Sequence, residues 1–257
     1  MNIVIFPSKR FIQVWRRHLL VWRKSAATSL MGTLGEPFLY LLGMGYGLGR
    51  FVGEIEGVSY LVYLTSGILA ASSMNTATFE ALYGGFTRMT RQNTFHAMLA
   101  TPLTVVDIVA GEVVWGATKS LISGSAIFLV GNLLGSIPSD TAFLVLPVVF
   151  LSGIVFTSMA LVVVAVAPNY DFFLYYFTLV TTPMFLFCGV FFPVDSLPEM
   201  AQLVANMLPL AHVIALIRPL AIGLPLENPL FHIIALLFYA VLTFFLATRL
   251  LKKRLIV

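Results

Sequence analysis

Histidine side chains are the first place to look for metal or acid–base chemistry in this sequence. The four histidines, His18, His96, His212 and His232, are widely separated along the chain. Two imidazoles that bind zinc from one helix face stand four residues apart, as in H-E-x-x-H, and that spacing does not occur here. No G-x-S-x-G surrounds a serine, as it would at a hydrolase nucleophile. The sequence therefore predicts no metal site and no catalytic residue.

A phosphate-binding loop is the second chemistry to consider. Residues 111–120, GEVVWGATKS, contain two glycines followed by Lys119 and Ser120. In a phosphate loop, however, the lysine directly follows the second glycine, and the loop joins a strand to a helix. This stretch instead lies inside a long apolar run, so the sequence predicts no nucleotide site.

Glu112 and Lys119 are charged residues within that same apolar run. They are seven residues apart, which puts them on one helix face but about 10 Å apart along the axis. A direct ion pair between them is therefore not favoured. Two interpretations stay open: Lys119 reaches toward the membrane surface or pairs structurally, or these charges line a path through the protein.

The elements that must position these residues follow from composition. Of 257 residues, 59% are hydrophobic and only 10% are charged, against about 25% charged in a soluble domain. This composition argues against a soluble enzyme, a nucleic-acid-binding domain and a disordered chain, and it leaves lipid as the solvent. The apolar runs are long and unbroken, which favours helices over a transmembrane barrel. The single cysteine, Cys188, allows no internal disulfide.

We expect one all-α membrane domain over residues 1–257, with six transmembrane helices. The predicted spans are residues 28–49, 60–80, 113–134, 142–167, 172–192 and 229–248. The third apolar stretch, 103–134, exceeds the length that one span needs, so we expect an elbow in its first third. The proline-rich segment 193–228 cannot be one continuous helix, and we expect short helices there that dip into the membrane and return.

Residues 1–27 contain six basic residues and no acidic one. On a helical wheel, Phe11, Trp15 and Trp22 share one arc and the basic side chains the other. This pattern predicts an amphipathic helix in the membrane interface. A signal peptide is the rival interpretation, but a short apolar core directly after the charges and a small-residue cleavage site are not clear.

The basic residues also predict which side of the membrane is inside. Twelve of the fifteen lie in the N-terminal tail, the 84–101 loop and the C-terminal tail. The loops on the other side carry mostly acidic residues. Because cytoplasmic flanks are enriched in Lys and Arg, both termini are expected in the cytoplasm.

Several stretches resemble one known family over essentially the whole chain. They are residues 95–102 (FHAMLATP), residues 107–112 (DIVAGE), residues 188–198 (CGVFFPVDSLP), residues 208–212 (LPLAH), and Arg218-Pro219. With the basic first helix, they are similar to ABC-2 type transporter permeases, and within these to the subgroup that exports lipo-chitooligosaccharide nodulation signals. The residues that carry the family motif are Gly189, Phe191, Phe192, Pro193, Pro209, His212 and Arg218.

The resemblance implies a transport subunit of the bacterial inner membrane, not an enzyme. It implies a homodimer that works with two separate ATPase subunits, which would hold the ATP and Mg; no cofactor is expected on this chain. Membrane lipids and an amphiphilic substrate would be its other partners, and nucleic acid would not be one. Lipid and drug exporters share much of the pattern, so they stay as alternatives. A stand-alone carrier would be expected to show deeply buried acids or repeat symmetry, which we do not find in the sequence.

The resemblance also assigns provisional roles to residues. The loop 84–101 would form a coupling helix on the ATPase, with Phe95, Met98 and Leu99 as apolar anchors and Arg88 and Arg91 at the rim. Three further residues complete this group: His96, Thr101 and Pro102. The dimer seam would involve spans one and five, and the candidate residues of the translocation path are Tyr40, Tyr46, Glu112, Lys119, Tyr175, Tyr176 and Phe185.

Overall fold

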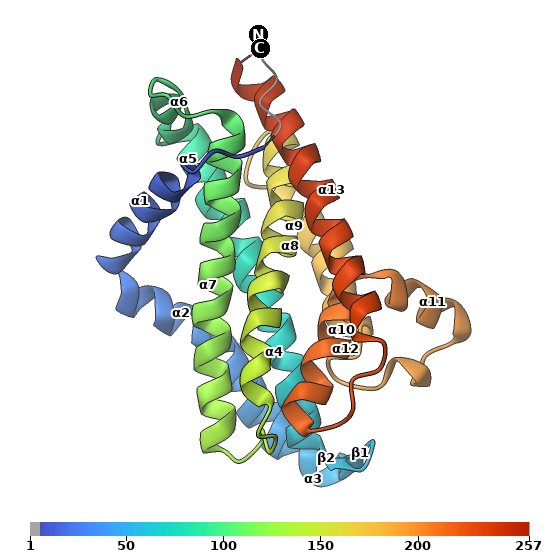
Figure 1. Cartoon of the computed structure of the whole chain (residues 1–257). Coiled ribbons are helices and arrows are strands. Elements are labelled where there is room, and N and C mark those ends of the chain that lie inside the picture. Colours follow the sequence, from blue (N-terminus) through green and yellow to red (C-terminus); the bar gives the residue numbers. More distant parts are fainter. Residues whose placement is uncertain (1–5, 257) are drawn as a thin grey trace.

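The computed structural model describes residues 6–256, except for the side chains of residues 33, 34 and 36. The first five residues of the expected interfacial segment, and Val257, lie outside this part. The described chain is an elongated helical bundle with one small hairpin, in which β1 (Glu54–Ile55) pairs antiparallel with β2 (Val58–Ser59) (Figure 1). The expected all-α fold is confirmed.

Three helices of the described chain are long and apolar enough to cross a membrane: α7 (Val105–Leu133), η3 with α8 (Ala142–Val166), and α13 (Pro229–Ile256). Helices α11 (Glu199–Met207) and α12 (Pro209–Ile222) are together long and apolar enough for a fourth crossing. They meet at an 85° bend, so this crossing would be a broken span. Pro209 starts the second helix of this pair, since a proline lacks the N–H that a continuing helix would need.

The other expected spans are helices interrupted by π-helical turns. The first comprises α2 (Ala26–Tyr40), η1 (Leu41–Leu48) and α3 (Gly49–Val52). The second comprises α4 (Tyr60–Phe79), η2 (Glu80–Gly85) and α5 (Phe86–Thr90). The third comprises α9 (Phe172–Tyr176), η4 (Phe177–Thr181) and α10 (Thr182–Phe187). Such turns occur mostly as single insertions and often mark functional sites.

The expected elbow in the third stretch is wrong. Helix α7 runs without a break from Val105, because a capping box holds its first turn: the Thr104 side chain accepts from the Asp107 N–H, and Asp107 accepts from the Thr104 N–H. Asp107 also accepts two hydrogen bonds from Ser8, at 2.7 and 2.8 Å. The N-terminal segment is thereby tied to the start of α7.

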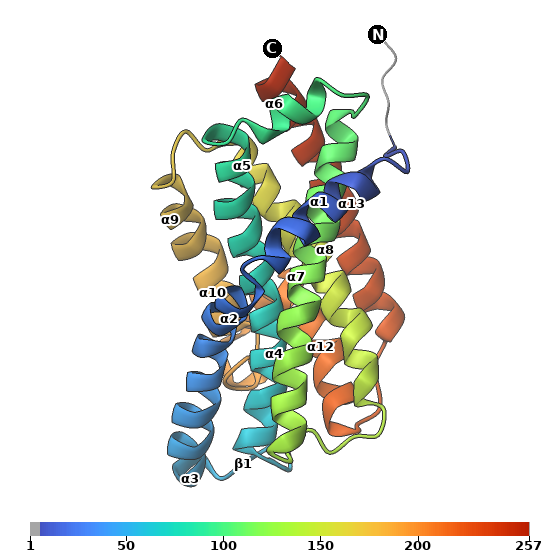
Figure 2. The same cartoon turned by 90° about the vertical axis from the view of Figure 1, so that its left-hand side faces the viewer.

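Helix α1 (Phe11–Arg23) lies across the outside of α7 (Figure 2). The wheel placed its aromatic arc in lipid, but two of those rings face protein. Trp15 Nε1 donates to Thr118 Oγ1 at 3.0 Å, and the Trp22 ring meets the Trp115 ring edge-on at 6.2 Å. Gly111 of α7 lets α1 approach closely, because a Cβ at position 111 would lie 2.4 Å from Val14 Cβ.

Helices α4, α7 and α8 form the centre of the bundle and approach closely. Small residues let this happen: a Cβ placed on Gly153 of α8 would lie 2.6 Å from the Ala117 Cα of α7. Hydroxyl pairs join the same helices, with Ser73 and Ser152 at 2.7 Å and Ser72 and Ser123 at 3.0 Å. Each such interhelical pair is worth about 0.6 to 2 kcal/mol.

Candidate functional site

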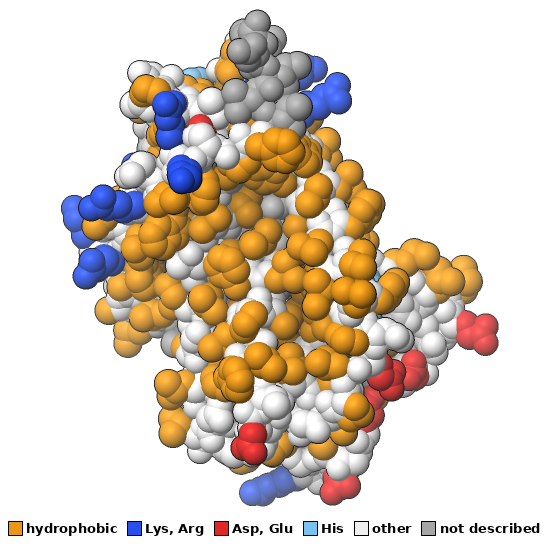
Figure 3. All heavy atoms as spheres, in the orientation of Figure 1, with side chains coloured by type: hydrophobic (Ala, Val, Ile, Leu, Met, Phe, Trp, Pro, Cys, Tyr) orange, Lys and Arg blue, Asp and Glu red, His pale blue; other side chains and the backbone are white. Residues whose placement is uncertain are grey.

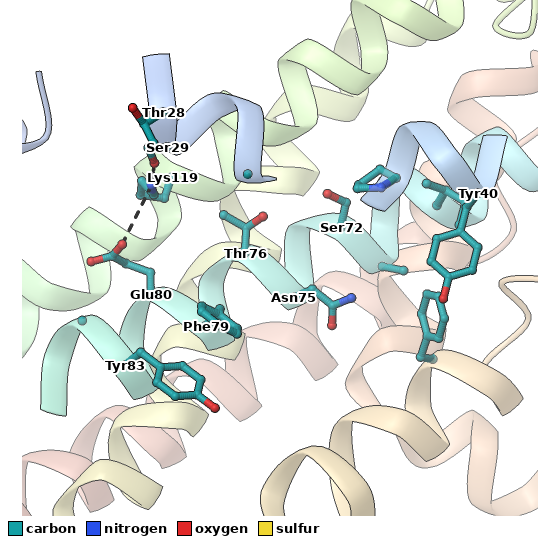
Figure 4. A pocket seen from close by; sticks show the side chains of 16 residues that line it. Thr28, Ser29, Tyr40, Ser72, Asn75, Thr76, Phe79, Glu80, Tyr83 and Lys119 are labelled. Atoms are coloured by element: carbon teal, nitrogen blue, oxygen red, sulfur yellow. Dashed lines mark hydrogen bonds and ion pairs between the residues drawn. The ribbon is translucent and has the colours of Figure 1, made fainter. Parts of the chain in front are cut away.

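A cavity of about 540 Å³ lies between α2, α4 with η2, α7 and α10. One wall is a polar face of α4 and η2 on which Ser72, Asn75, Thr76 and Glu80 recur every three or four residues (Figure 4). Aromatic side chains make up much of the rest of the lining: Tyr40, Phe79, Tyr83 and Phe185. The cavity therefore offers hydrogen-bonding groups and ring faces side by side, which suits an amphiphile.

Glu80 and Lys119 place opposite charges at one end of this cavity (Figure 4). Their Oε2 and Nζ atoms are 3.9 Å apart. The Lys119 ammonium also donates to Ser29 Oγ at 2.5 Å, so it joins α7 to α2 as well as to η2. The two charges are mostly buried and balance each other in the cavity wall.

Glu80 and Lys119 also belong to a buried charge cluster that extends away from the cavity. Its other members are His18, Arg88 and Glu112. The Arg88 guanidinium holds Glu112 with two nitrogens, Nε to Oε1 at 3.0 Å and Nη2 to Oε2 at 2.5 Å. Its third nitrogen donates to Glu80 Oε1 at 2.9 Å. His18 Nε2 of α1 lies 2.9 Å from Glu112 Oε1. The two cations of the cluster, Arg88 and Lys119, are matched in number by its two carboxylates, Glu80 and Glu112.

The charge cluster joins three parts of the chain that are distant in sequence: α1, the continuous segment of η2 and α5, and α7. Arg88 belongs to α5, Glu80 to η2, Glu112 and Lys119 to α7, and His18 to α1. Trp115 Nε1 adds a hydrogen bond to Glu80 Oε1 at 2.9 Å. Because Glu112 is only 2% exposed, losing Arg88 would leave its carboxylate without its bidentate cation in a low-dielectric site. The cluster therefore fixes the position of α5, and with it the start of the 84–101 loop, relative to the cavity.

The residues proposed for the path separate into two groups. Tyr40, Lys119 and Phe185 line the cavity. Glu112 does not line it and is buried in the charge cluster, and Tyr176 is a half-buried residue away from the lining.

Tyr46 and Tyr175 lie on the outer surface, 48% and 64% exposed. Neither residue belongs to the cavity lining.

The 84–101 loop contains a short helix, α6 (Thr94–Leu99), but its apolar residues do not face outward as we expected. Phe95 is fully buried and Met98 is 8% exposed, both in the protein's own core. Leu99 is half-buried. The anchor role assigned to Phe95 and Met98 is therefore wrong, because these side chains hold the loop to the bundle and offer no surface to a partner.

The rim role assigned to Arg88 is also corrected, since Arg88 is a buried member of the charge cluster. The residues that the loop does expose are Thr90, Arg91, Gln92, Asn93, His96, Ala97 and Ala100, followed by Thr101 and Pro102. This exposed set is polar and basic, and we call it the loop surface.

The sequence pattern of the "ABC-2 type transporter" family matches residues 9–222. The chain belongs to the ABC-2 type transporter family. It is 46% identical to "Nodulation protein J" of Rhizobium meliloti over 95% of this chain and 94% of that one. It is 47% identical to the protein of the same name from Rhizobium leguminosarum bv. trifolii, over 97% and 95%. Against "Inner membrane transport permease YadH" of Escherichia coli the identity is 21%, over 79% and 78%.

In this ABC-2 permease, the motif residues after α10 build a compact cluster around Arg218. Gly189 adopts φ of +90°, a conformation that favours glycine, and its carbonyl accepts from Arg218 Nη2 at 2.6 Å. The Arg218 guanidinium lies 3.7 Å from the centre of the Tyr63 ring and donates to Ser66 Oγ at 3.1 Å. Arg218 of α12 thus ties the turn after α10 to α4.

The other motif residues are structural as well. Phe191 packs against the rings of Tyr40 and Phe185, which line the cavity. Phe192 and Pro193 follow in the same turn and are half-buried.

His212 in α12 approaches His232 in α13, with the Nδ1 atoms 3.0 Å apart. Sequence spacing gave no sign of this pair. Even so, no group of three metal-ligating side chains occurs in the part of the ABC-2 permease that the structure describes.

The polar wall of the cavity was not among the predicted features of the ABC-2 permease. Ser72, Asn75, Thr76 and Glu80 were read as part of an ordinary span. Their spacing of three and four residues already puts them on one helix face, so the signal was present. By contrast, the pairing of His18 with Glu112 depends on how α1 crosses α7, and spacing carries no information about that.

Proposed function

We propose that this ABC-2 permease moves an amphiphilic lipo-oligosaccharide outward across the inner membrane, as a homodimer driven by two separate ATPase subunits. The observation that carries the proposal is the cavity, in which a hydroxyl-rich and charge-balanced wall faces aromatic rings. Sugar hydroxyls find donors and acceptors on α4, and aromatic faces accept the apolar faces of sugar rings or an acyl chain. Two relatives are named "Nodulation protein J". A role in nodulation supports this substrate class.

The proposed topology has six spans, with both termini in the cytoplasm. The interrupted helices 26–52, 60–90 and 172–187 would supply the crossings that are not continuous apolar helices. Basic side chains gather at the end of the molecule that holds α6 and the end of α13, and acidic ones at the end that holds β1 and β2 (Figure 3). The positive-inside rule assigns the first of these ends to the cytoplasm.

Coupling to the ATPase is proposed to run through the loop surface. ATP-driven closure of the ATPase dimer would push on residues 90–102, and α5 would carry the motion inward. Arg88, at the centre of α5, would transmit this motion through its ion pairs to Glu112 on α7 and to Glu80 at the cavity. Helix α5 and the ion pairs of Arg88 therefore join the loop surface to the proposed substrate site.

The test is ATPase stimulation in the reconstituted complex of the permease with its proposed ATPase subunits. We expect acylated chitotetraose to stimulate hydrolysis severalfold more than a cationic amphiphilic drug or a phospholipid does. Strong stimulation by the drug with none by the acylated oligosaccharide would replace this substrate class by drug export. Transport by the permease without any ATPase would contradict the proposal as a whole.

A second test separates coupling from substrate binding. The double variant Arg91→Glu, His96→Glu changes only exposed side chains of the loop surface. We expect it to abolish stimulation of the ATPase while acylated chitotetraose still binds the permease. Arg50→Glu, exposed in α3, is the control and should leave stimulation unchanged.

A further inference from the structure

Helix α1 carries a hollow on the side that faces away from α7. Its volume is about 350 Å³, and its lining residues are Gln13, Arg16, Arg17, Leu20, Val21 and Lys24. These positions recur at intervals of three or four, so they form one face of the helix. Basic side chains gather along α1 at the edge of the molecule (Figure 3).

The three cations of this hollow have no protein anion to neutralise them. Across residues 6–256, no carboxylate lies within 4 Å of Arg16, Arg17 or Lys24. The acidic group whose field reaches Arg17 is Glu112, and Glu112 is already held by Arg88 and His18. A site with three unpaired positive charges attracts an anion.

The apolar part of the lining says what kind of anion fits. Leu20 and Val21 stand between the cations and are 51% and 56% exposed. They put a patch of exposed hydrocarbon beside the charges. A small soluble anion gains nothing from that patch, whereas a phospholipid has a phosphate for the cations and acyl carbons for the patch.

We propose that this hollow binds the phosphate head group of an anionic phospholipid in the leaflet on which α1 lies. The phosphate contacts Arg16, Arg17 and Lys24, and the first acyl carbons lie along Leu20 and Val21. The bound lipid holds the outer side of α1, while Val14 and His18 hold its inner side to α7. This site is separate from the transport cavity, and its occupancy does not depend on which substrate is exported.

The test uses purified, delipidated permease and native mass spectrometry. Dioleoyl phosphatidylglycerol should bind at least tenfold more tightly than dioleoyl phosphatidylcholine. The double variant Arg16→Gln, Lys24→Gln removes two exposed cations, and about fivefold per charge is expected to be lost, or roughly 25-fold in all. Its matched control is Arg249→Gln, Lys253→Gln, two exposed cations of α13, which should retain the wild-type affinity for phosphatidylglycerol.

A second pair of measurements tests the apolar half of the site. The variant Leu20→Ser, Val21→Ser should weaken phosphatidylglycerol binding severalfold while leaving any weak binding of inorganic phosphate unchanged. Three results would overturn the proposal: equal affinity for the two lipids, an equal loss in the α13 control, or displacement of the lipid by millimolar inorganic phosphate. An acidic peptide that displaces the lipid would point to a protein partner at this face instead.

Discussion

At the scale of single residues, the arrangement around Arg88 is the most consequential feature. One guanidinium satisfies two carboxylates that come from different helices, and its planar fork matches the Glu112 carboxylate. Its side chain is 12% exposed, so solvent offers little compensation if a partner is removed. Buried pairs of this kind add little net stability but are costly to break on one side.

Arg88→Gln should therefore destabilise the permease by about 3 to 5 kcal/mol, because Glu112 and Glu80 both lose their cation. Unfolding in detergent, followed by circular dichroism against temperature or denaturant, measures the change. Arg91→Gln, three residues on and exposed, is the matched control and should stay within about 0.5 kcal/mol of the wild type. The double variant Arg88→Met, Glu112→Met should cost less than Arg88→Gln alone, and a larger cost would show that the charges are not the reason.

Arg218→Lys tests the contacts of Arg218 with Tyr63, Ser66 and Gly189. A lysine keeps the charge but loses the planar stack on Tyr63 and the pair of bonds to Gly189 and Ser66. We expect a loss of about 1 to 2 kcal/mol in the same unfolding assay. Arg50→Lys, an exposed position of α3, should be neutral, and equal stability of the two variants would contradict the role given to Arg218.

At the scale of elements, sequence patterns predicted where helices lie better than what they contact. The long apolar runs located α7, α8 and α13, and the prolines located the break between α11 and α12. The spacing of Glu112 and Lys119 was rightly judged too long for an ion pair, but their actual partners lie on η2, α5, α1 and α2. Such pairings depend on helix crossings, which no local pattern encodes. Likewise, the spacing of Phe95 and Met98 in α6 predicted a face that docks on the ATPase. In the structure, this face packs against the permease's own core.

Gly153→Ala tests the close approach of α8 to α7. The added methyl would lie 2.6 Å from a backbone atom of Ala117, which cannot rotate away, so the helices must separate. Overpacking of this kind costs about 1 to 3 kcal/mol. Gly43→Ala, where nothing lies within 4 Å, is the control and should be neutral or slightly stabilising. Equal effects at the two positions would mean that the α7–α8 contact is not tight.

At the scale of the whole molecule, the face drawn in Figure 3 has most of its basic side chains toward one end and its acidic ones toward the other, with many apolar side chains between them. That sorting is what the proposed orientation rests on. Replacing the buried Cys188 by alanine, which adds no polar group to the core, gives a background for labelling.

Single cysteines at Asp140 and Glu227 should react with a membrane-impermeant thiol reagent in intact spheroplasts. Cysteines at Asn93 and Lys253 should react only after the membrane is opened. Both residues of each pair are exposed. In spheroplasts from cells without the ATPase subunits, which would cover Asn93, access is decided by the side of the membrane alone. Labelling of Asn93 or Lys253 in sealed spheroplasts would reverse the proposed topology.

The hydroxyl pairs that join α4 to α7 and α8 have a consequence for the order in which the protein is made. Under the proposed topology, α4 carries a polar face that single-helix insertion disfavours, and its partners Ser123 and Ser152 are synthesised about 50 and 80 residues later. Nascent chains truncated before α7 should therefore leave α4 incompletely inserted, and chains extended through α8 should recover it. The same serines that join the helices of the folded bundle are thus expected to delay the stable insertion of α4 into the membrane during biogenesis.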